Sequence, residues 1–415
     1  MSAPSMKRLA FASVVGTALE YYDFAVYNTL AALVFNHVFF PTVDPLSGAL
    51  FAFATFWVGY LSRPVGGVLF GHLGDRRGRR FVLVITLLVM GLTTVAIGLL
   101  PGYAQIGALA PILLVTLRFV QGVALGGEWA GAVLLTMEHG EESRRGRNAS
   151  FAQMGPAIGV LLATVSVALT TWVFTQEELL AWGWRVPLLV SALLVGFGLW
   201  VRRSVPESPQ FQGVDQASHR APLRELVRDH WRGLMLAGLA RTGPDVLYSL
   251  LSVFVLTYLT TVLGMSRTLG TSALAVGAAV CAVMIYIAGR MSDRFGRRLV
   301  YAVASVATMI WLWMLFPMLE TRTDWVVVLV FVSGLTLHAF MYGPQAAFIA
   351  EQFPTHVRYA GASLAYTFAG VFAGGLAPFA FTALYKSWGT TTVVVIYTSV
   401  AMVITLVALK LARSR

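Results

Sequence analysis

The sequence contains a single cysteine and little charge, and both shortages limit what the protein can be. Cys281 is the only thiol among 415 residues, so an intramolecular disulfide and a cysteine-based metal cluster are excluded. Charged residues make up 12% of the chain, about half the share of a soluble domain. Hydrophobic residues make up 57%, and the mean hydropathy is +0.74. This composition predicts an integral membrane protein.

The chain also has few of the residues from which enzymes build active sites. It contains only three lysines and no glycine-lysine pair, so a phosphate-binding loop of the Walker A type is absent. The seven histidines are scattered along the sequence and do not predict a metal-binding group. No nucleophile or cofactor motif is present. We therefore expect no enzyme, no cofactor and no metal.

Long apolar runs recur along the whole chain with short polar interruptions. A membrane span needs roughly 20 apolar residues, and twelve such runs begin near residues 9, 48, 81, 106, 147, 183, 233, 268, 299, 324, 357 and 389. The first run is not a signal peptide, because Glu20 and Asp23 interrupt it and no small-residue cleavage site ends it. We predict an all-α membrane protein with twelve transmembrane helices.

The longest polar break divides these runs into six and six. It contains three prolines between residues 206 and 222, which oppose a continuous helix. The predicted organisation is therefore an N-terminal half over 1–203, a cytoplasmic linker over 204–232 and a C-terminal half over 233–415.

The two halves share a repeated sequence signature. The segment 71–80 (GHLGDRRGRR) recurs 218 residues later as 289–298 (GRMSDRFGRR), and the pair Glu138 and Arg145 recurs with the same spacing as Glu351 and Arg358. Either basic turn alone is explained by anchoring at the membrane surface. Repetition at a fixed offset instead favours the duplicated halves of an alternating-access carrier.

We expect the repeated turns to gate one face of the protein. Asp75 is predicted to cap the amino terminus of the third span, while the arginines pair across the interface between the halves. The predicted gating residues are Gly71, Asp75, Arg76, Gly78, Arg79, Arg80, Glu138, Arg145, Asp293, Arg294, Gly296, Arg297, Arg298, Glu351 and Arg358.

The net charge of +11 could suggest a nucleic-acid partner, but the positions of the charges favour a membrane topology. With a cytoplasmic amino terminus, 23 basic residues lie on the inside, four on the outside and three within spans. This asymmetry follows the positive-inside rule. We predict a multi-pass protein of the bacterial inner membrane with both termini in the cytoplasm. The lipid bilayer, not nucleic acid, is its surrounding partner, and we expect a monomer.

The turn at 71–80 resembles the signature loop of the major facilitator superfamily. Further segments resemble its metabolite:proton symporters, and above all their shikimate-like branch: EYYDF at 20–24, RPVGG at 63–67, RFVQG at 118–122, GGEW at 126–129, WGWRVP at 182–187 and PESP at 206–209. That family includes carriers of shikimate, citrate, 2-oxoglutarate and proline or betaine. The resemblance implies two pseudo-symmetric six-helix halves and coupling of a small organic solute to a proton.

Seven ionisable residues lie inside predicted spans. They are Glu20, Asp23, Arg63, Arg118, Glu128, Arg241 and Asp245. An ionisable group in hydrocarbon costs several kcal/mol, so it normally faces a water-filled cavity or a partner and is a candidate for function. Spacings of four, three and four residues place polar faces on the first and seventh spans. The alternative is a set of buried structural ion pairs.

The proton-coupling residues are predicted from the likeness to sugar porters of the same superfamily. By that likeness Asp23 carries the proton and Arg118 is its partner, because separating the two in a dry site lets the carboxylate take up a proton. Helical rise places the two residues about 9 Å apart in depth. Glu128 therefore remains a competing partner for Arg118, and Glu20 a competing proton carrier.

The sign of the substrate is predicted from the arginines. Asp23 can satisfy only one of three in-span guanidinium groups, which leaves one to bind a carboxylate. A small organic acid, such as a hydroxylated cyclic acid like shikimate, is the favoured solute. The predicted substrate-binding residues are Tyr22, Tyr27, Trp57, Arg63, Trp129, Gln153, Arg241, Asp245, Tyr248 and Gln345.

Two other readings stay open from the residues alone. Glu20 and Asp245 with the same aromatic rings could form a cage for a zwitterion such as proline or glycine betaine. Arg63 belongs to a stretch shared by the family, so its role could be structural. A channel or membrane sensor is the rival from another class, and only a symporter accumulates solute against a gradient.

Overall fold

A computed structural model describes residues 6–41, 55, 57–203 and 222–412. Its described part is almost entirely helical, and ten of its helices are long and apolar enough to cross a membrane. Two further spans complete the set of twelve. They are α1 (Met6–Leu30), which carries Glu20 and Asp23, and α4 (Arg63–Arg77), which follows the described helical residues 57–61. Residues 204–221, with Pro206 and Pro209, lie outside the described ranges.

The N-terminal half contains nine described α-helical segments. Their bounds are α1 (Met6–Leu30), α2 (Asn36–Phe39), α4 (Arg63–Arg77), α5 (Arg79–Leu99), α6 (Tyr103–Ile106), α7 (Leu109–His139), α8 (Arg145–Val173), α9 (Gln176–Glu178) and α10 (Arg185–Arg203). Where the predicted spans fall on described residues, the helices begin within three residues of the predicted starts in both halves. This agreement is expected, because hydropathy alone sets where a span begins.

The C-terminal half begins after a short linker helix, α12 (Pro222–Asp229). Its helices are α13 (Trp231–Ala240), α14 (Thr242–Ser249), α15 (Arg267–Phe295), α16 (Arg297–Glu320), α17 (Asp324–Glu351), α18 (Arg358–Ala369), α19 (Ala377–Trp388) and α20 (Thr392–Leu411). The seventh span joins α13 and α14, and the eleventh joins α18 and α19. The fold is therefore the predicted pair of six-helix halves.

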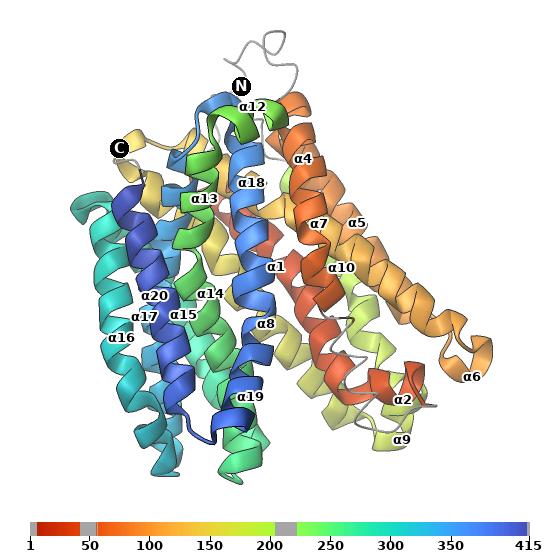
Figure 1. Cartoon of the computed structure of the whole chain (residues 1–415). Coiled ribbons are helices and arrows are strands. Elements are labelled where there is room, and N and C mark those ends of the chain that lie inside the picture. The colour runs from red at the N-terminus through yellow and green to blue at the C-terminus, as the bar shows by residue number, and fades with distance from the viewer. Residues whose placement is uncertain (1–5, 42–54, 56, 204–221, 413–415) are drawn as a thin grey trace.

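The two halves pack against each other through helices of both halves and diverge at one end. Helix α8 packs against α15 and α17, while α18 packs against α4 and α7. We call the end of the bundle where α1 begins and α20 ends the terminal face, and the opposite end the distal face. Figure 1 shows the halves side by side at the terminal face and spread apart toward the distal face, where α2, α9 and α19 lie. The described conformation is thus closed at the terminal face.

Glycines permit two features of the backbone: the repeated turns with positive φ and the close crossing of α4 and α7. Gly78 and Gly296 occupy the same position in the two repeated turns and have φ of 101° and 91°, a region that side chains with a Cβ rarely adopt. Gly66 lets α4 lie directly on α7, because a Cβ there would stand 1.8 Å from the carbonyl oxygen of Val123. Small residues at such crossings are the usual means by which membrane helices approach closely.

Several helices bordering the interface contain π-helical turns. These are Ala31–Phe35 after α1, Leu250–Val255 and Tyr258–Val262 after α14, and Gly370–Gly375 after α18. In each of these spans the α-helix begins near the terminal face, and the π-helical turns follow toward the distal face. The π-helical turn is rare and often marks a functional region.

Candidate functional site

A cluster of aromatic side chains lies at the centre of the molecule, where the halves meet. The indole of Trp129 on α7 stacks on the ring of Tyr366 on α18, with ring centroids 3.9 Å apart and planes 12° apart. The Tyr366 hydroxyl lies 3.2 Å from that of Tyr21 on α1 and 3.0 Å from that of Tyr342 on α17. Trp129 was predicted, whereas Tyr366, from the other half, carries no sequence signal of its own.

Arg241 forms an ion pair beside this cluster. Its Nε lies 2.8 Å from Oδ2 of Asp245, one helical turn further along the seventh span. The guanidinium also lies over the ring of Tyr366 and donates to the backbone carbonyl of that residue. Both charged side chains are buried. Arg241 is therefore neutralised within its own half.

Arg63 is buried, and some of its hydrogen-bond donors have no partner among the described residues. It is 4% exposed, and its guanidinium carbon lies 3.9 Å from the ring centroid of Tyr60 and 4.6 Å from that of Phe24. Its Nε and Nη2 make no hydrogen bond to any described residue. Tyr60 and Asp245 both lie close to Gly374, which brings Arg63 near the Arg241 pair. Among the predicted arginines, Arg63 leaves two nitrogens without a partner in the described part of the chain, whereas Arg118 leaves only its Nε.

Arg118 is held by neutral partners within the N-terminal half. It donates to Oδ1 of Asn28 at 2.6 Å and to Oε1 of Gln121 at 3.1 Å, and it lies 4.0 Å from the ring centroids of Phe24 and Tyr27. The expected pair between Arg118 and Asp23 is not formed in this conformation.

Asp23 lies nearby with hydroxyl partners only. It is 2% exposed and accepts a hydrogen bond of 2.6 Å from Ser191 of α10. No ion pair reaches its carboxylate from the described part of the chain. A buried carboxylate in such a setting is costly when ionised.

Glu20 and Glu128 share one guanidinium that the sequence did not point to. Arg202 of α10 lies 3.0 Å from Oε1 of Glu20 and 3.2 Å from Oε1 of Glu128, and both glutamates are fully buried. The second oxygen of each glutamate has no hydrogen-bond partner in the part of the chain that the structure describes. Arg202 is one of the 23 basic residues that the sequence assigns to the inside. Its side chain does not lie at the membrane surface, since it turns inward and is 4% exposed.

The other predicted substrate-binding residues divide between the interface and the interior of one half. Gln153 accepts a 2.6 Å hydrogen bond from Trp129 and donates at 3.0 Å to the carbonyl of Tyr342 in the opposite half. By contrast, the hydroxyl of Tyr22 bonds to Pro187 within the N-terminal half, and that of Tyr27 to Thr55. These two tyrosines pack inside the N-terminal half.

Three further predicted residues lie near the centre. Trp57 packs against Gly375, and its indole nitrogen has no hydrogen-bond partner among the described residues. Gln345 donates to the hydroxyl of Tyr301 at 2.8 Å, and its amide oxygen has no partner in that part of the chain. Tyr248 is 36% exposed and lies beside His338, their ring centroids 5.4 Å apart.

The two repeated turns bind the opposite halves at the terminal face. Oδ2 of Asp75 accepts the backbone N–H of Ala360, in the first turn of α18, at 3.0 Å. Asp293 accepts those of Gly146 and Arg147, in the first turn of α8, at 2.8 and 2.9 Å. The prediction that Asp75 caps the third span is therefore wrong, because each aspartate meets a helix amino terminus of the other half.

Ion pairs reinforce this closure. Glu138 lies 3.3 Å from Arg79 in its own half and 3.4 Å from Arg358 in the other. Arg297 lies 2.7 Å from Asp293 and 3.4 Å from Glu351. Among the remaining gating residues, Arg145 pairs with Glu142 rather than across the interface, and Arg298 donates to the carbonyl of Ala412. Gly71 packs on Ala360 of the other half. Arg76 and Arg294 are exposed.

Two of the scattered histidines come together with a glutamate at the linker. Candidate ligand atoms of Glu225, His230 and His356 lie within 4.8 Å of one another. The expectation that no histidines group with a potential metal ligand is thus wrong. Glu225 already lies 2.7 Å from His356, and the linker sequence around it is rich in arginine, which disfavours a divalent cation.

Comparison with known proteins relates the chain to membrane carriers. Residues 13–378 and 245–415 match the family model described as Major Facilitator Superfamily. An inner membrane metabolite transport protein of Escherichia coli (strain K12) is 40% identical over 394 residues, 93% of this chain and 89% of that protein. The shikimate transporter of the same organism is 39% identical, over 92% of this chain and 89% of that protein.

More distant similarities extend the comparison. A proline/betaine transporter of Salmonella typhimurium is 33% identical, over 89% of this chain and 76% of that protein. Among solved structures, the proton:xylose symporter XylE bound to 6-bromo-6-deoxy-D-glucose superposes with a TM-score of 0.80 at 18% identity, covering 98% of this chain and 94% of that one. At that identity the likeness concerns the fold.

Proposed function

The chain belongs to the major facilitator superfamily of transporters, and we propose that it is a proton-coupled symporter that imports a small organic acid by alternating access. The observation that carries the proposal is Arg63, whose buried guanidinium keeps two N–H-bearing nitrogens without a hydrogen-bond partner among the described residues. A carboxylate is the ligand that such a group binds best, because it can accept two parallel charged hydrogen bonds.

The charge balance at the centre supports an anionic substrate. The arginines there outnumber the carboxylates by three to two, the residues being Arg63, Arg118, Arg241, Asp23 and Asp245. With Asp23 ionised, a bound carboxylate makes the balance even. Uncompensated charge in a membrane interior is costly, so the excess of positive charge favours an anionic solute.

The same geometry disfavours the zwitterion alternative. A cage for a quaternary ammonium needs free carboxylates, whereas Asp245 is paired with Arg241 and Glu20 with Arg202. The aromatic wall of Trp129 and Tyr366 suits a ring-bearing acid, for which shikimate is the example. A relative named as a shikimate transporter is consistent with that choice, although proline/betaine carriers are also among the relatives.

We assign the coupled proton to Asp23. It is buried and lacks a cationic partner in this conformation, so taking up a proton removes the cost of an isolated charge. The Glu20–Arg202–Glu128 group is the competing site, because two carboxylates there share one guanidinium.

The transport cycle follows from the two faces. We propose that the terminal face is cytoplasmic, as the positive-inside rule indicates, so that the described conformation is closed toward the cytoplasm. The moving units are the halves 1–203 and 233–415, joined by the linker 204–232, and one chain is sufficient. Loading with acid and proton then releases the contacts at the terminal face.

Substrate binding is tested by screening organic acids, aromatic acids and betaines for thermal stabilisation of the purified protein. For an acid that binds, Arg63→Gln should weaken affinity roughly tenfold to a hundredfold, since a charged hydrogen bond contributes about 1.5–3 kcal/mol. The same substitution should change the affinity for the uncharged amide of that acid little. Arg267→Gln, at an exposed position of the distal face, is the control. Saturable uptake of glycine betaine without competition from organic acids would overturn the assignment.

Coupling is tested in proteoliposomes with Asp23→Asn. The variant should exchange labelled solute normally but should not accumulate it under an inward proton gradient, because exchange needs no net proton movement. If accumulation and its pH dependence are unchanged, Asp23 is not the carrier, and Glu20→Gln and Glu128→Gln become the informative variants. A wild-type protein that equilibrates solute but never concentrates it would indicate a channel.

A further inference from the structure

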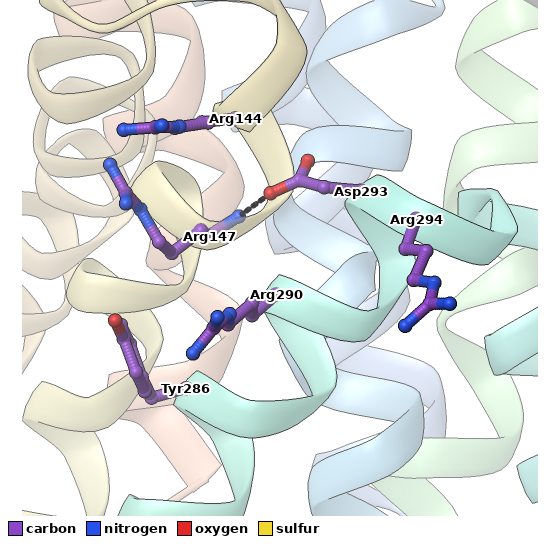
Figure 2. A pocket seen from close by; sticks show the side chains of 6 residues that line it. All are labelled: Arg144, Arg147, Tyr286, Arg290, Asp293 and Arg294. Carbon is purple, nitrogen blue, oxygen red and sulfur yellow. Dashed lines mark hydrogen bonds between the residues drawn. The ribbon is translucent and has the colours of Figure 1, made fainter.

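A basic hollow of about 430 Å³ opens at the terminal face between the two halves. Its walls come from the start of α8 and from the last turns of α15, and the lining residues are Arg144, Arg147, Tyr286, Arg290, Asp293 and Arg294. Figure 2 shows Arg144 and Arg147 on one wall, and Tyr286 and Arg290 extending from α15 toward the same space. Neither half forms the hollow alone.

The positive charge of this basic hollow is not neutralised from within. Asp293 is the only carboxylate of its lining, and its oxygens already accept two backbone N–H groups of α8 and the side chain of Arg297. Arg147 bonds to the neutral amide of Asn148. Four arginines therefore line the hollow with one engaged carboxylate, and Figure 2 shows the Arg294 side chain directed away from Arg144 and Arg147.

Neighbouring acids do little to change this balance. Arg144 pairs with Glu141 at 3.2 Å, but both side chains are more than half exposed, and exposed pairs are weak. Arg290 and Arg294 have no ion-pair partner among the described residues. Because arginines of one half face arginines of the other, their repulsion opposes closure of the terminal face.

We propose that the basic hollow binds a phosphate-bearing anion that bridges the two halves and stabilises closure of the terminal face. A phosphate group offers two negative charges and several acceptor oxygens, which match the planar donor fork of arginine. The Tyr286 hydroxyl supplies a further donor. The volume falls in the range of small-molecule sites, about 300–1,000 Å³.

The bridging position gives the anion a regulatory effect. A ligand that contacts both halves binds the closed terminal face better than the open one, so it shifts the population toward the closed state. The source of the phosphate group is either a soluble phosphate ester or an anionic lipid headgroup at the membrane surface. The site is separate from the central one and does not depend on which solute is transported.

The test uses the full-length protein in phosphatidylcholine nanodiscs at constant ionic strength. Glycerol 3-phosphate is titrated against glycerol for the soluble source, and nanodiscs containing phosphatidic acid are compared for the lipid source. Arg147→Gln combined with Arg290→Gln is the test variant. Lys7→Gln combined with Arg8→Gln, at exposed positions of the terminal face, is the charge-matched comparison. Thermal stability and affinity are measured for each.

Closure is measured as a distance between spin labels. Ser143→Cys and Leu299→Cys place exposed labels on the two halves at the terminal face, and Cys281→Ser removes the only native thiol. The phosphate-bearing ligand should stabilise the wild type and increase the short-distance population. In the Arg147→Gln, Arg290→Gln variant the affinity should fall at least about tenfold, since two charged contacts are lost. The Lys7→Gln, Arg8→Gln variant should bind normally.

Each outcome decides a part of the proposal. A response to the soluble ester alone or to the lipid alone supports the site and identifies its source. Equal responses in the wild type and the Arg147→Gln, Arg290→Gln variant overturn it, as does the absence of a response to either source. Stabilisation without a change in the label distances overturns the bridging role.

Discussion

Asp293 should control how firmly the terminal face is closed. Its carboxylate accepts two backbone N–H groups of the opposite half, at 2.8 and 2.9 Å, and also pairs with Arg297. Asp293→Asn keeps one acceptor oxygen but loses the charge and the second acceptor. A hydrogen bond to a charged group contributes about 1.5–3 kcal/mol, and the positive end of helix α8 adds about 0.3–1 kcal/mol at an exposed site.

These contacts exist only when the halves are docked at the terminal face. Losing one charged hydrogen bond should therefore shift the equilibrium toward an open terminal face by roughly 10- to 150-fold. The spin-label pair at positions 143 and 299 measures that shift directly. In transport, the maximal rate should change more than the affinity for solute, because the substituted group lies far from the central site.

Two comparisons separate this effect from general destabilisation. Asp75→Asn should produce a smaller shift, because only one oxygen of Asp75 has a hydrogen-bond partner and the other is buried without one. Asp324→Asn removes a carboxylate from the first turn of α17 at the distal face and should leave the label distances unchanged. Unchanged distances in Asp293→Asn, or a larger shift in Asp75→Asn, would refute the reasoning.

Two further substitution pairs test the packing and the buried charges. Gly66→Ala should prevent stable folding, because its Cβ would stand 1.8 Å from a backbone oxygen. Gly196→Ala, whose Cβ would have no atom within 4 Å, should raise the free energy of unfolding by about 0.5–1 kcal/mol. Thermal melting of the two purified proteins tests both. Arg202→Gln should lower the free energy of unfolding by about 3–5 kcal/mol, because it leaves two buried carboxylates without a cationic partner. Glu128→Gln should lower it much less, because Arg202 still pairs with Glu20. Equal losses in that second pair would contradict the shared-guanidinium arrangement.

Features that depend on local composition could be predicted from the sequence. Apolar run length set the helix starts to within three residues, and the repeat of Gly78 at Gly296 marked the turns whose positive φ requires glycine. The pair of Arg241 and Asp245 lies four residues apart on one helix face, so their contact follows from helical geometry.

Contacts between distant segments could not be predicted in the same way. Nothing in the sequence around Asp75 indicates that its partner is the first turn of α18, 285 residues away. Arg202 precedes a polar break, which is typical of an interface cation, and only the packing of α10 against α1 brings it to Glu20. Likewise, the likeness that paired Asp23 with Arg118 could not reveal that Asn28 and Gln121 already hold that arginine.

The π-helical turns after α1, α14 and α18 have a mechanical consequence for the order of events in transport. A wide turn accommodates an extra residue, so these helices can bend near the distal face by exchanging backbone hydrogen bonds rather than breaking them. The terminal face, in contrast, is fastened by discrete carboxylate and arginine contacts that must all be released together. The distal face can thus change by bending of helices, whereas the terminal face can open only when these contacts break. We expect opening of the terminal face to be the slower step and to have the steeper temperature dependence.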